Sequence, residues 1–395
     1  MSEEQQYRGV RAVTRGPKHH FFGYYDKSPW DATGRHLLAL ETAFMDRPPA
    51  ADDTAIIGVV DLAQGRRFRP LAETRAWNWQ QGSMLQWVAL AADRLIIHND
   101  RIRDRFVSTV RDIDTGESRT LPRPIYALTR DGSRALSVNF ARLHRLRPGY
   151  GYAGAPDPRA DDPHPVDDGV YLMDLSTGEH RLVMSLAQIA AFRRDATMEG
   201  GHHWFNHLLV SPDNGRFIFL HRWQRKEGGR YTRMFTANLD GSGLWCAPAD
   251  EMVSHFDWCG SDRILAWARR RDIGERYYLF TDRSEEFEVV GEGVLTEDGH
   301  CSYSPDGRWL LTDTYPDRER MRRLILYHSA DKRRVDIGRF FSPAALELEI
   351  RCDLHPRWSR DGRQVCIDSA HEGARQVYVV DAAPITCRGQ LGRLD

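Results

Sequence analysis

Four histidines occupy equivalent positions in a repeated pattern of this 395-residue chain. His207, His255, His300 and His355 each stand four residues before a turn of the Ser-Pro-Asp-Gly type or a degenerate copy of it. If equivalent positions of neighbouring repeats meet, the imidazoles converge, and imidazole nitrogen is a common ligand of divalent metals. The pattern predicts one divalent metal, Mn, Zn or Ca, on these four residues. The alternative is a set of hydrogen-bonded histidines in a water-filled channel.

Aromatic, amide and guanidinium side chains gather in the segments that flank these positions. Segments before the turns are rich in Trp, Tyr, Phe, His and Gln, and those after the following strand are rich in Arg. Aromatic faces and planar guanidinium forks suit a sugar that carries carboxylates. The residues predicted to bind such an acidic oligosaccharide or polysaccharide are Tyr24, Trp79, Gln81, Arg101, Arg142 and Tyr315.

The elements that would position these residues are short strands around the recurring turn. The turn reads SPWDATGR from Ser28, TRDGSR from Thr129, SPDNGR from Ser211, SPDGR from Ser304 and SRDGR from Ser359, with degenerate copies at Val88 and Cys259. Each copy lies between two apolar runs, which is typical of a β-hairpin, and a second pair of runs follows it. Two hairpins make a four-stranded antiparallel sheet, and repeats of about 40–50 residues are typical of β-propellers.

The seven turn copies predict an all-β fold, a seven-bladed β-propeller of four-stranded antiparallel blades. Residues 1–395 are expected to form this one domain. A strand at about residues 9–15 is expected to join the last blade and close the ring, because closure leaves fewer open sheet edges. The inner strands then run along the axis, so that the four histidines lie at one mouth of the channel. A short helix is expected only at Ser185–Phe192.

Composition argues against several classes of protein. A net charge of −1 gives no strong field towards nucleic acid or an anionic membrane. No apolar stretch has the length of a transmembrane helix, and the first residues lack the apolar core of a signal peptide. We therefore expect a cytoplasmic protein, or a periplasmic or secreted one if a leader has been removed.

The segments HHFFGYYDKSPWD, AWNWQQGSMLQW, HHWFNHLLVSPD, GHCSYSPDGRWLLTDTYPD and DLHPRWSRDG resemble the propeller-type polysaccharide lyases. The resemblance is greater to the ulvan lyases than to oligogalacturonate lyase, and in blade pattern it covers nearly the whole chain. It implies cleavage of uronic-acid glycosides by β-elimination, with His or Tyr as base and Arg or a metal against the carboxylate. Arg222 matches the arginine of the ulvan lyases, whereas their tyrosine position holds Asn206 or His207. The oligogalacturonate lyases bind a divalent ion through axial histidines, which resembles the repeat histidines of the last three blades.

Elimination beside an ionised carboxylate needs that charge neutralised and needs a base whose pKa is near ambient pH. The chain offers Arg222 and the predicted metal as neutralising groups. His203 follows a Gly-Gly pair that lets its loop approach a substrate closely, and it is the first expected base. His98, in an Arg-rich exit loop, is the second.

Three other functions are compatible with the same scaffold, since a fold does not determine chemistry. A glycoside hydrolase usually needs two carboxylates across the bond, and Asp313, Asp317, Asp368 and Glu372 lie on the mouth without an evident pair. An iron oxygenase like the carotenoid oxygenases would use four axial histidines, but these loops are too polar for a lipid tunnel. The third alternative is a propeller that binds acidic sugars without catalysis.

Overall fold

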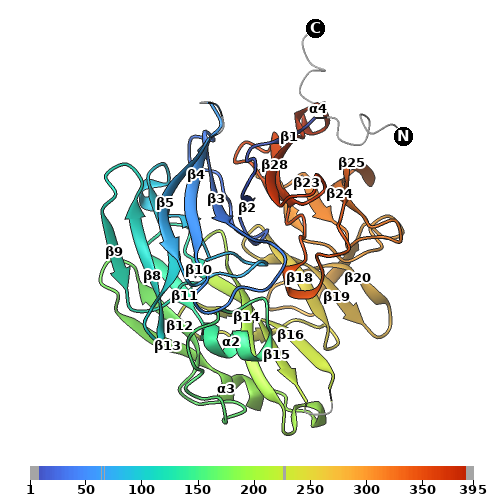
Figure 1. The fold of residues 1–395 in the computed structure, drawn as a ribbon. Coiled ribbons are helices and arrows are strands. Elements are labelled where there is room, and N and C mark those ends of the chain that lie inside the picture. Colours follow the sequence, from blue (N-terminus) through green and yellow to red (C-terminus); the bar gives the residue numbers. More distant parts are fainter. Residues whose placement is uncertain (1–8, 64, 66, 226–227, 388–395) are drawn as a thin grey trace.

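Seven four-stranded antiparallel sheets surround a central axis (Figure 1). This computed structural model describes residues 9–387 except 64, 66, 226 and 227. The predicted all-β fold, a seven-bladed propeller of four-stranded blades, is confirmed.

The blades follow one another in chain order, and in the first six the four strands are hydrogen-bonded in sequence order. Blades 1 and 2 contain β2 (His19–Phe21), β3 (His36–Thr42), β4 (Ala55–Asp61), β5 (Phe68–Thr74), β6 (Gln86–Trp87), β7 (Leu95–Ile102), β8 (Arg105–Asp112) and β9 (Ser118–Leu121). Blades 3 and 4 contain β10 (Ala127–Leu128), β11 (Arg134–Ser137), β12 (Gly169–Asp174), β13 (His180–Ser185), β14 (His202–Val210), β15 (Arg216–Gln224), β16 (Arg230–Asn238) and β17 (Trp245–Cys246). Blades 5 and 6 contain β18 (Val253–Cys259), β19 (Arg263–Arg270), β20 (Gly274–Thr281), β21 (Phe287–Val290), β22 (Ser302–Tyr303), β23 (Trp309–Asp313), β24 (Met321–His328) and β25 (Arg333–Phe341).

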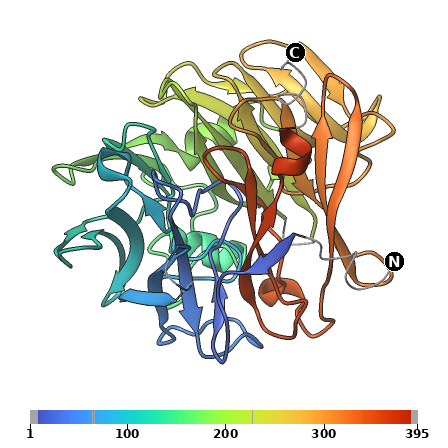
Figure 2. The same ribbon diagram turned by 90° about the horizontal axis from the view of Figure 1, so that it is seen from above.

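The last blade joins the two ends of the chain. It contains β26 (Arg357–Trp358), β27 (Gln364–Ser369), β28 (Gln376–Asp381) and the N-terminal strand β1 (Val10–Ala12). β1 pairs antiparallel with β28, so the first and last strands of the propeller lie side by side (Figures 1 and 2). A strand from one terminus thereby covers the edge that the other terminus would leave open.

The recurring turn is stabilised by the same hydrogen bonds in several blades. In blade 6 the Ser304 hydroxyl donates to Asp306 (2.6 Å) and accepts from the Trp309 amide (3.0 Å), while Gly307 adopts a φ of +71°. Ser359 makes the equivalent bonds to Asp361 and to the amide of Gln364 in blade 7. These short polar contacts explain why the turn sequence recurs, because they connect the two inner strands of a blade.

Apolar side chains fill the spaces between neighbouring blades. One cluster joins blades 1 and 2 and includes Leu40, Ile57, Trp77, Trp87 and Ile96, each at most 6% exposed. Comparable clusters join the other blades and hold the ring rigidly around its axis.

Helices are few and short in the described part of the chain. They are α2 (Phe140–Leu146), α3 (Leu186–Ala191), α4 (Ala383–Thr386) and the 3₁₀ turns η1 (Ala89–Ala91), η2 (Ala196–Met198) and η3 (Leu348–Ile350). α3 confirms the helix expected near Ser185, whose side chain forms a capping box with Gln188. α2 was not predicted, and it belongs to residues 138–168, a long connection between β11 and β12 that we call the strap. Within the described residues, no helix is both long and apolar enough to cross a membrane.

Candidate metal centre and arginine pocket

The four repeat histidines are all buried, with at most 5% of each residue exposed. His207 and His255 lie at β-bulges of β14 and β18, where the strand register shifts. Bulges redirect side chains, and here they accompany the approach of these strands to the axis. The ring centroids of His255 and His300 are 4.1 Å apart, and those of His300 and His355 are 4.4 Å apart.

Three residues bring possible metal-ligating atoms together. Nitrogens of His300 and His355 and a carboxylate oxygen of Asp353 all lie within 4.8 Å of one another, and we call these residues the donor triad. His300 Nε2 and His355 Nε2 are buried and have no hydrogen-bond partner among the described residues, whereas Asp353 Oδ1 lies 2.8 Å from Arg322 Nη2. Such unpaired buried atoms cost free energy, which a bound cation would recover.

Neighbouring groups orient the triad as they do in metal sites. Asp313 lies 2.9 Å from His300 Nδ1, which leaves Nε2 free to bind a cation. Burial lowers the pKa of His300, but Asp313, Asp353 and Asp298 outweigh that effect and raise it above the ordinary value. The electrostatic potential at the His300 ring is therefore negative. Two imidazoles and one carboxylate suit Mn²⁺ or Zn²⁺ better than Ca²⁺, which prefers six to eight oxygen ligands.

The structure brings the predicted four-histidine set together only in part. The ring of His207 stacks on Tyr24 at 4.9 Å, and Tyr24 in turn packs against His355 at 5.0 Å, so that an aromatic ring stands in the channel beside the triad. His255 lies next to His300, and its Nδ1 is 2.9 Å from Asp298. Neither histidine belongs to the triad, which contains Asp353 instead.

Asp353 was not found from the sequence because it is not a histidine at the repeat position. It lies two residues before His355, and an aspartate at that spacing was the only signal available. Its carboxylate forms ion pairs with Arg322 (2.8 Å) and Arg351 (2.6 Å). Burial would raise its pKa, but Arg351 and Arg322 outweigh burial and hold the pKa well below the ordinary value, so Asp353 stays ionised.

A cavity of about 580 Å³ opens beside the donor triad. It is lined by residues of blades 4 to 6 that include Arg222, Arg230, Asp298 and Tyr315, and we call it the arginine pocket. The ring of Tyr315 lies 6.2 Å from that of His300, so the pocket and the triad are neighbours.

Among the described residues, Arg222 and Arg230 have no carboxylate partner. No hydrogen bond or ion pair joins either guanidinium group to another residue in the described part of the chain, and Arg222 is only 7% exposed. Burial and the adjacent Arg230 and Arg147 lower the pKa of Arg222 to about 10, so it remains a cation at neutral pH. A buried cation without a counter-ion is strongly unfavourable, which makes this pocket a site for an anionic ligand.

The two histidines predicted as bases lie away from Arg222. On β14, His203 pairs with Trp223, whereas Arg222 pairs with Trp204, and successive residues of a strand point to opposite faces. His203 Nδ1 lies 2.8 Å from His221 Nε2, and burial is the main cause that lowers its pKa to about 3. His98 is 2% exposed within blade 2, where burial lowers its pKa. The structure therefore does not bring either base together with the predicted neutralising arginine.

Three of the predicted sugar-binding residues lie at the channel or the pocket. Tyr315 lines the arginine pocket and is 38% exposed. Tyr24 stands in the channel, and Gln81 donates to the Tyr126 hydroxyl (2.7 Å) near His207. Both Tyr24 and Gln81 are buried, so they shape the channel beneath the pocket.

The other three are engaged in holding loops together. Arg142 donates to the carbonyl oxygens of His203, Arg159, Asp162 and Pro163, and it also approaches Asp157, so its guanidinium group has no donor left for a sugar. Arg101 donates to the carbonyls of Ala51 (2.7 Å) and Gly154 (3.0 Å). Trp79 donates to the carbonyl of Arg47 (2.8 Å) within a buried cluster.

The carboxylates considered for hydrolysis are also engaged. Asp313 contacts His300, Asp368 pairs with Arg357, and Glu372 accepts from Tyr378. Asp317 accepts two backbone amides of its own turn. These contacts do not leave two of them facing each other across a glycosidic bond.

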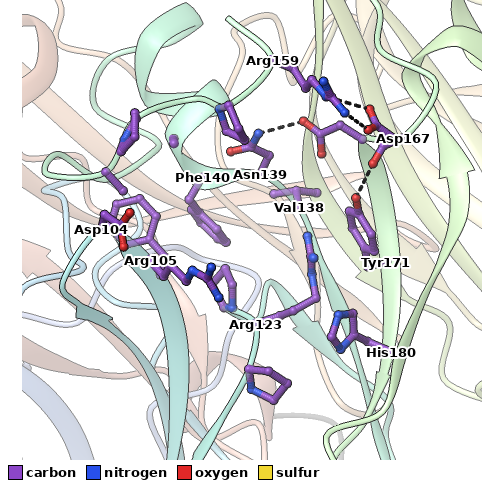
Figure 3. A pocket seen from close by; sticks show the side chains of 18 residues that line it. Asp104, Arg105, Arg123, Val138, Asn139, Phe140, Arg159, Asp167, Tyr171 and His180 are labelled. Atoms are coloured by element: carbon purple, nitrogen blue, oxygen red, sulfur yellow. Dashed lines mark hydrogen bonds and ion pairs between the residues drawn. The ribbon is translucent and has the colours of Figure 1, made fainter.

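A second cavity, of about 700 Å³, lies between blades 2 and 3 beside the strap (Figure 3). Two of its arginines already have partners: Arg159 pairs with Asp167, and the Arg123 guanidinium lies 3.4 Å from the ring centroid of Tyr171. Neither group resembles Arg222 of the arginine pocket, which is buried without a partner among the described residues.

No protein-family model matches the chain, and no curated protein matches it. Among solved structures, an oligogalacturonate lyase from Vibrio parahaemolyticus is 14% identical with a TM-score of 0.66, covering 96% of this chain and 94% of that one. An oligogalacturonate lyase in complex with manganese is 15% identical with a TM-score of 0.67, covering 94% and 92%. The β-propeller domain of the trilobed protease from Pyrococcus furiosus is 11% identical with a TM-score of 0.52, covering 88% and 90%. At such identities the likeness establishes a shared propeller fold, and the ulvan lyase resemblance stays a prediction.

Proposed function

We propose that the protein is a lyase that cleaves a uronic-acid glycoside by β-elimination at the arginine pocket. The observation that carries the proposal is the pair of unpaired guanidinium groups, Arg222 and Arg230, beside the donor triad. A carboxylate of the substrate would supply the missing counter-charge, and a guanidinium fork can bind both of its oxygens. The structural likeness to oligogalacturonate lyases supports this choice of chemistry.

The reaction explains why positive charge is needed there. The hydrogen on C5 of a uronate is weakly acidic because the adjacent carboxylate is already negative. Arg222 would bind that carboxylate and stabilise the negative charge that develops as the hydrogen leaves. Because Arg222 is buried, this interaction is stronger than it would be in water.

A divalent cation fits the donor triad. His300 and His355 would hold it through their unpaired Nε2 atoms and Asp353 through its carboxylate, and it would add positive charge next to the pocket. A similar fold solved in complex with manganese supports a divalent ion of this kind.

Incubation with a panel of uronate-containing oligosaccharides and polysaccharides is expected to raise absorbance in the near ultraviolet. The reason is that elimination leaves a double bond conjugated with the carboxylate of the product. New reducing ends without that absorbance would indicate a hydrolase instead. Binding without any product would indicate a carbohydrate-binding propeller.

Replacing Arg222 by alanine is expected to lower kcat/KM on the best substrate by about 10²-fold or more, as removal of one charge-stabilising donor does. A matched control is Arg263→Ala, since Arg263 is an exposed arginine of blade 5 that approaches Glu288 at the surface (3.5 Å). The two variants should differ in rate, and Arg222→Ala should melt no lower than Arg263→Ala, because it removes a buried cation without a counter-ion. Equal rates for both would remove Arg222 from the mechanism.

A further inference from the structure

Tyr150 stands among the cations of the channel mouth. It lies in the strap and is 5% exposed, and its hydroxyl accepts a hydrogen bond from Arg351 Nη2 at 2.8 Å. The guanidinium group of Arg147 lies 4.9 Å from its ring centroid, and its ring packs edge-on against His207 at 5.5 Å. The hydroxyl is thus held by a guanidinium group that also pairs with Asp353.

The strap backbone positions Tyr150 closely. Gly151 packs tightly against α2, so that a Cβ at this position would lie 2.1 Å from the backbone nitrogen of His144. Gly149 has a φ of +89° and packs against Glu349, which lies four residues before Asp353 in the chain. The two glycines therefore let the strap pack closely against α2 on one side and Glu349 on the other. Tyr150, between the two glycines, is held in place by both contacts.

The surrounding charges favour the ionised form of this tyrosine. Burial would raise the pKa of Tyr150, but Arg351 and Arg147 outweigh burial and the opposing Asp353, and lower the pKa to about 8. A pKa of about 8 leaves roughly a tenth of the hydroxyl groups ionised at pH 7. The charged and titratable groups that face it are Tyr24, Arg147, His207, Arg222, Arg230, Tyr315, Arg351 and Asp353.

Tyr150 also lies near the predicted carboxylate site. Its charge acts on Arg222 and on Arg230, the two arginines that line the pocket. A carboxylate bound by Arg222 would therefore lie within the electrostatic reach of the Tyr150 hydroxyl. His203, by contrast, lies on the other face of blade 4.

We propose that the Tyr150 phenolate is the base that removes the C5 proton, an inference that rests on the proposed lyase function. The phenolate oxygen forms a bond to the hydrogen, and the C5–H electron pair becomes the C4–C5 double bond as the C4–O4 bond breaks. The leaving oxygen takes a proton from water. Tyr150 then returns its proton to the hydroxide so formed, which restores the phenolate.

The Tyr150→Phe variant tests this role, because it removes the hydroxyl and keeps the ring that packs on His207. Its kcat on the best substrate is expected to fall by about 10²-fold or more with little change in KM, as loss of a general base does. Tyr327→Phe is the matched control, since Tyr327 lies in the apolar cluster between blades 5 and 6. A Tyr150→Phe variant that keeps more than about a tenth of wild-type kcat would overturn the assignment.

An ultraviolet titration tests the same group without a substrate. The wild-type protein should show one tyrosine ionising near pH 8, and Tyr150→Phe should lack it, because the pKa values of Tyr24, Tyr126 and Tyr277 are raised well above the ordinary value. Absence of that ionisation in the wild-type protein overturns the assignment even if elimination occurs. If the wild-type protein shows the ionisation but forms no unsaturated product, the proposed lyase function is wrong. The assignment of Tyr150 as the base is then wrong as well.

Discussion

Protein purified without a metal-affinity step is expected to contain close to one equivalent of a divalent transition metal, and His300→Ala is expected to lose it. The donor triad has only three candidate ligand residues, so removal of one imidazole leaves too few. Elemental analysis of both proteins measures the content directly. If the metal contributes several kcal/mol of charge stabilisation, elimination by His300→Ala should fall on the order of 10³-fold.

Melting temperature gives a second readout that needs no substrate. Adding Mn²⁺ or Zn²⁺ to chelator-treated wild-type protein should raise its melting temperature, because a ligand that binds only the folded state stabilises it, by about 2.7 kcal/mol at 100 times its Kd. His300→Ala should not respond, whereas His180→Ala, on β13 of blade 3, should respond like the wild type. A metal-free wild-type protein whose stability does not change would leave the histidines as hydrogen-bonded groups of a wet channel.

The blade pattern was predictable because its causes are local. The Ser304 and Ser359 turns each form hydrogen bonds within a few residues, and alternating apolar runs on both sides specify the strands. The strap was not predictable as a structure, because it is inserted within blade 3, between β11 and β12, and so interrupts the repeat. Its helix α2 begins at the Asn139 cap, and its packing depends on contacts with residues far along the chain, such as Glu349.

The candidate site was also predictable only where its causes are local or follow from the repeat. The repeat position predicted that His300 and His355 converge, because equivalent positions of adjacent blades must meet around one axis. It could not predict that Tyr24 fills the channel beside His207, or that Asp353 completes the triad. Those outcomes depend on side-chain packing between blades rather than on any spacing in the chain.

The catalytic base could not be identified from the sequence alone. His203 was favoured for its residue type and a neighbouring Gly-Gly pair, but only the register of β14 and β15 shows that it and Arg222 face opposite sides. Tyr150 gives no sequence signal as a base. Its ionisation depends on Arg351, which comes from the segment that leads into blade 7.

Replacing Arg357 by methionine is expected to destabilise the fold by about 3–5 kcal/mol, because it leaves the Asp368 carboxylate as an unpaired buried charge. The two residues form an ion pair at 2.8 Å in blade 7, with side chains 1% and 3% exposed. Arg357 also donates to the carbonyls of Gly23 and Tyr24, and Asp368 accepts the amides of Phe22 and Gly23. The pair thus joins the last blade to the first where the ring closes.

Chemical denaturation of four proteins separates the charge effect from a loss of packing. Arg357→Met/Asp368→Asn removes both charges and keeps an amide oxygen for the Phe22 amide, so it should be more stable than Arg357→Met alone. Arg363→Met, an exposed turn arginine of the same blade, should stay within about 0.5 kcal/mol of wild type. If Arg357→Met and the double variant lose equal stability, the uncompensated carboxylate is not the cause. Because Arg357 also holds the Tyr24 carbonyl, the same substitution should loosen the channel wall beside the donor triad and weaken metal retention.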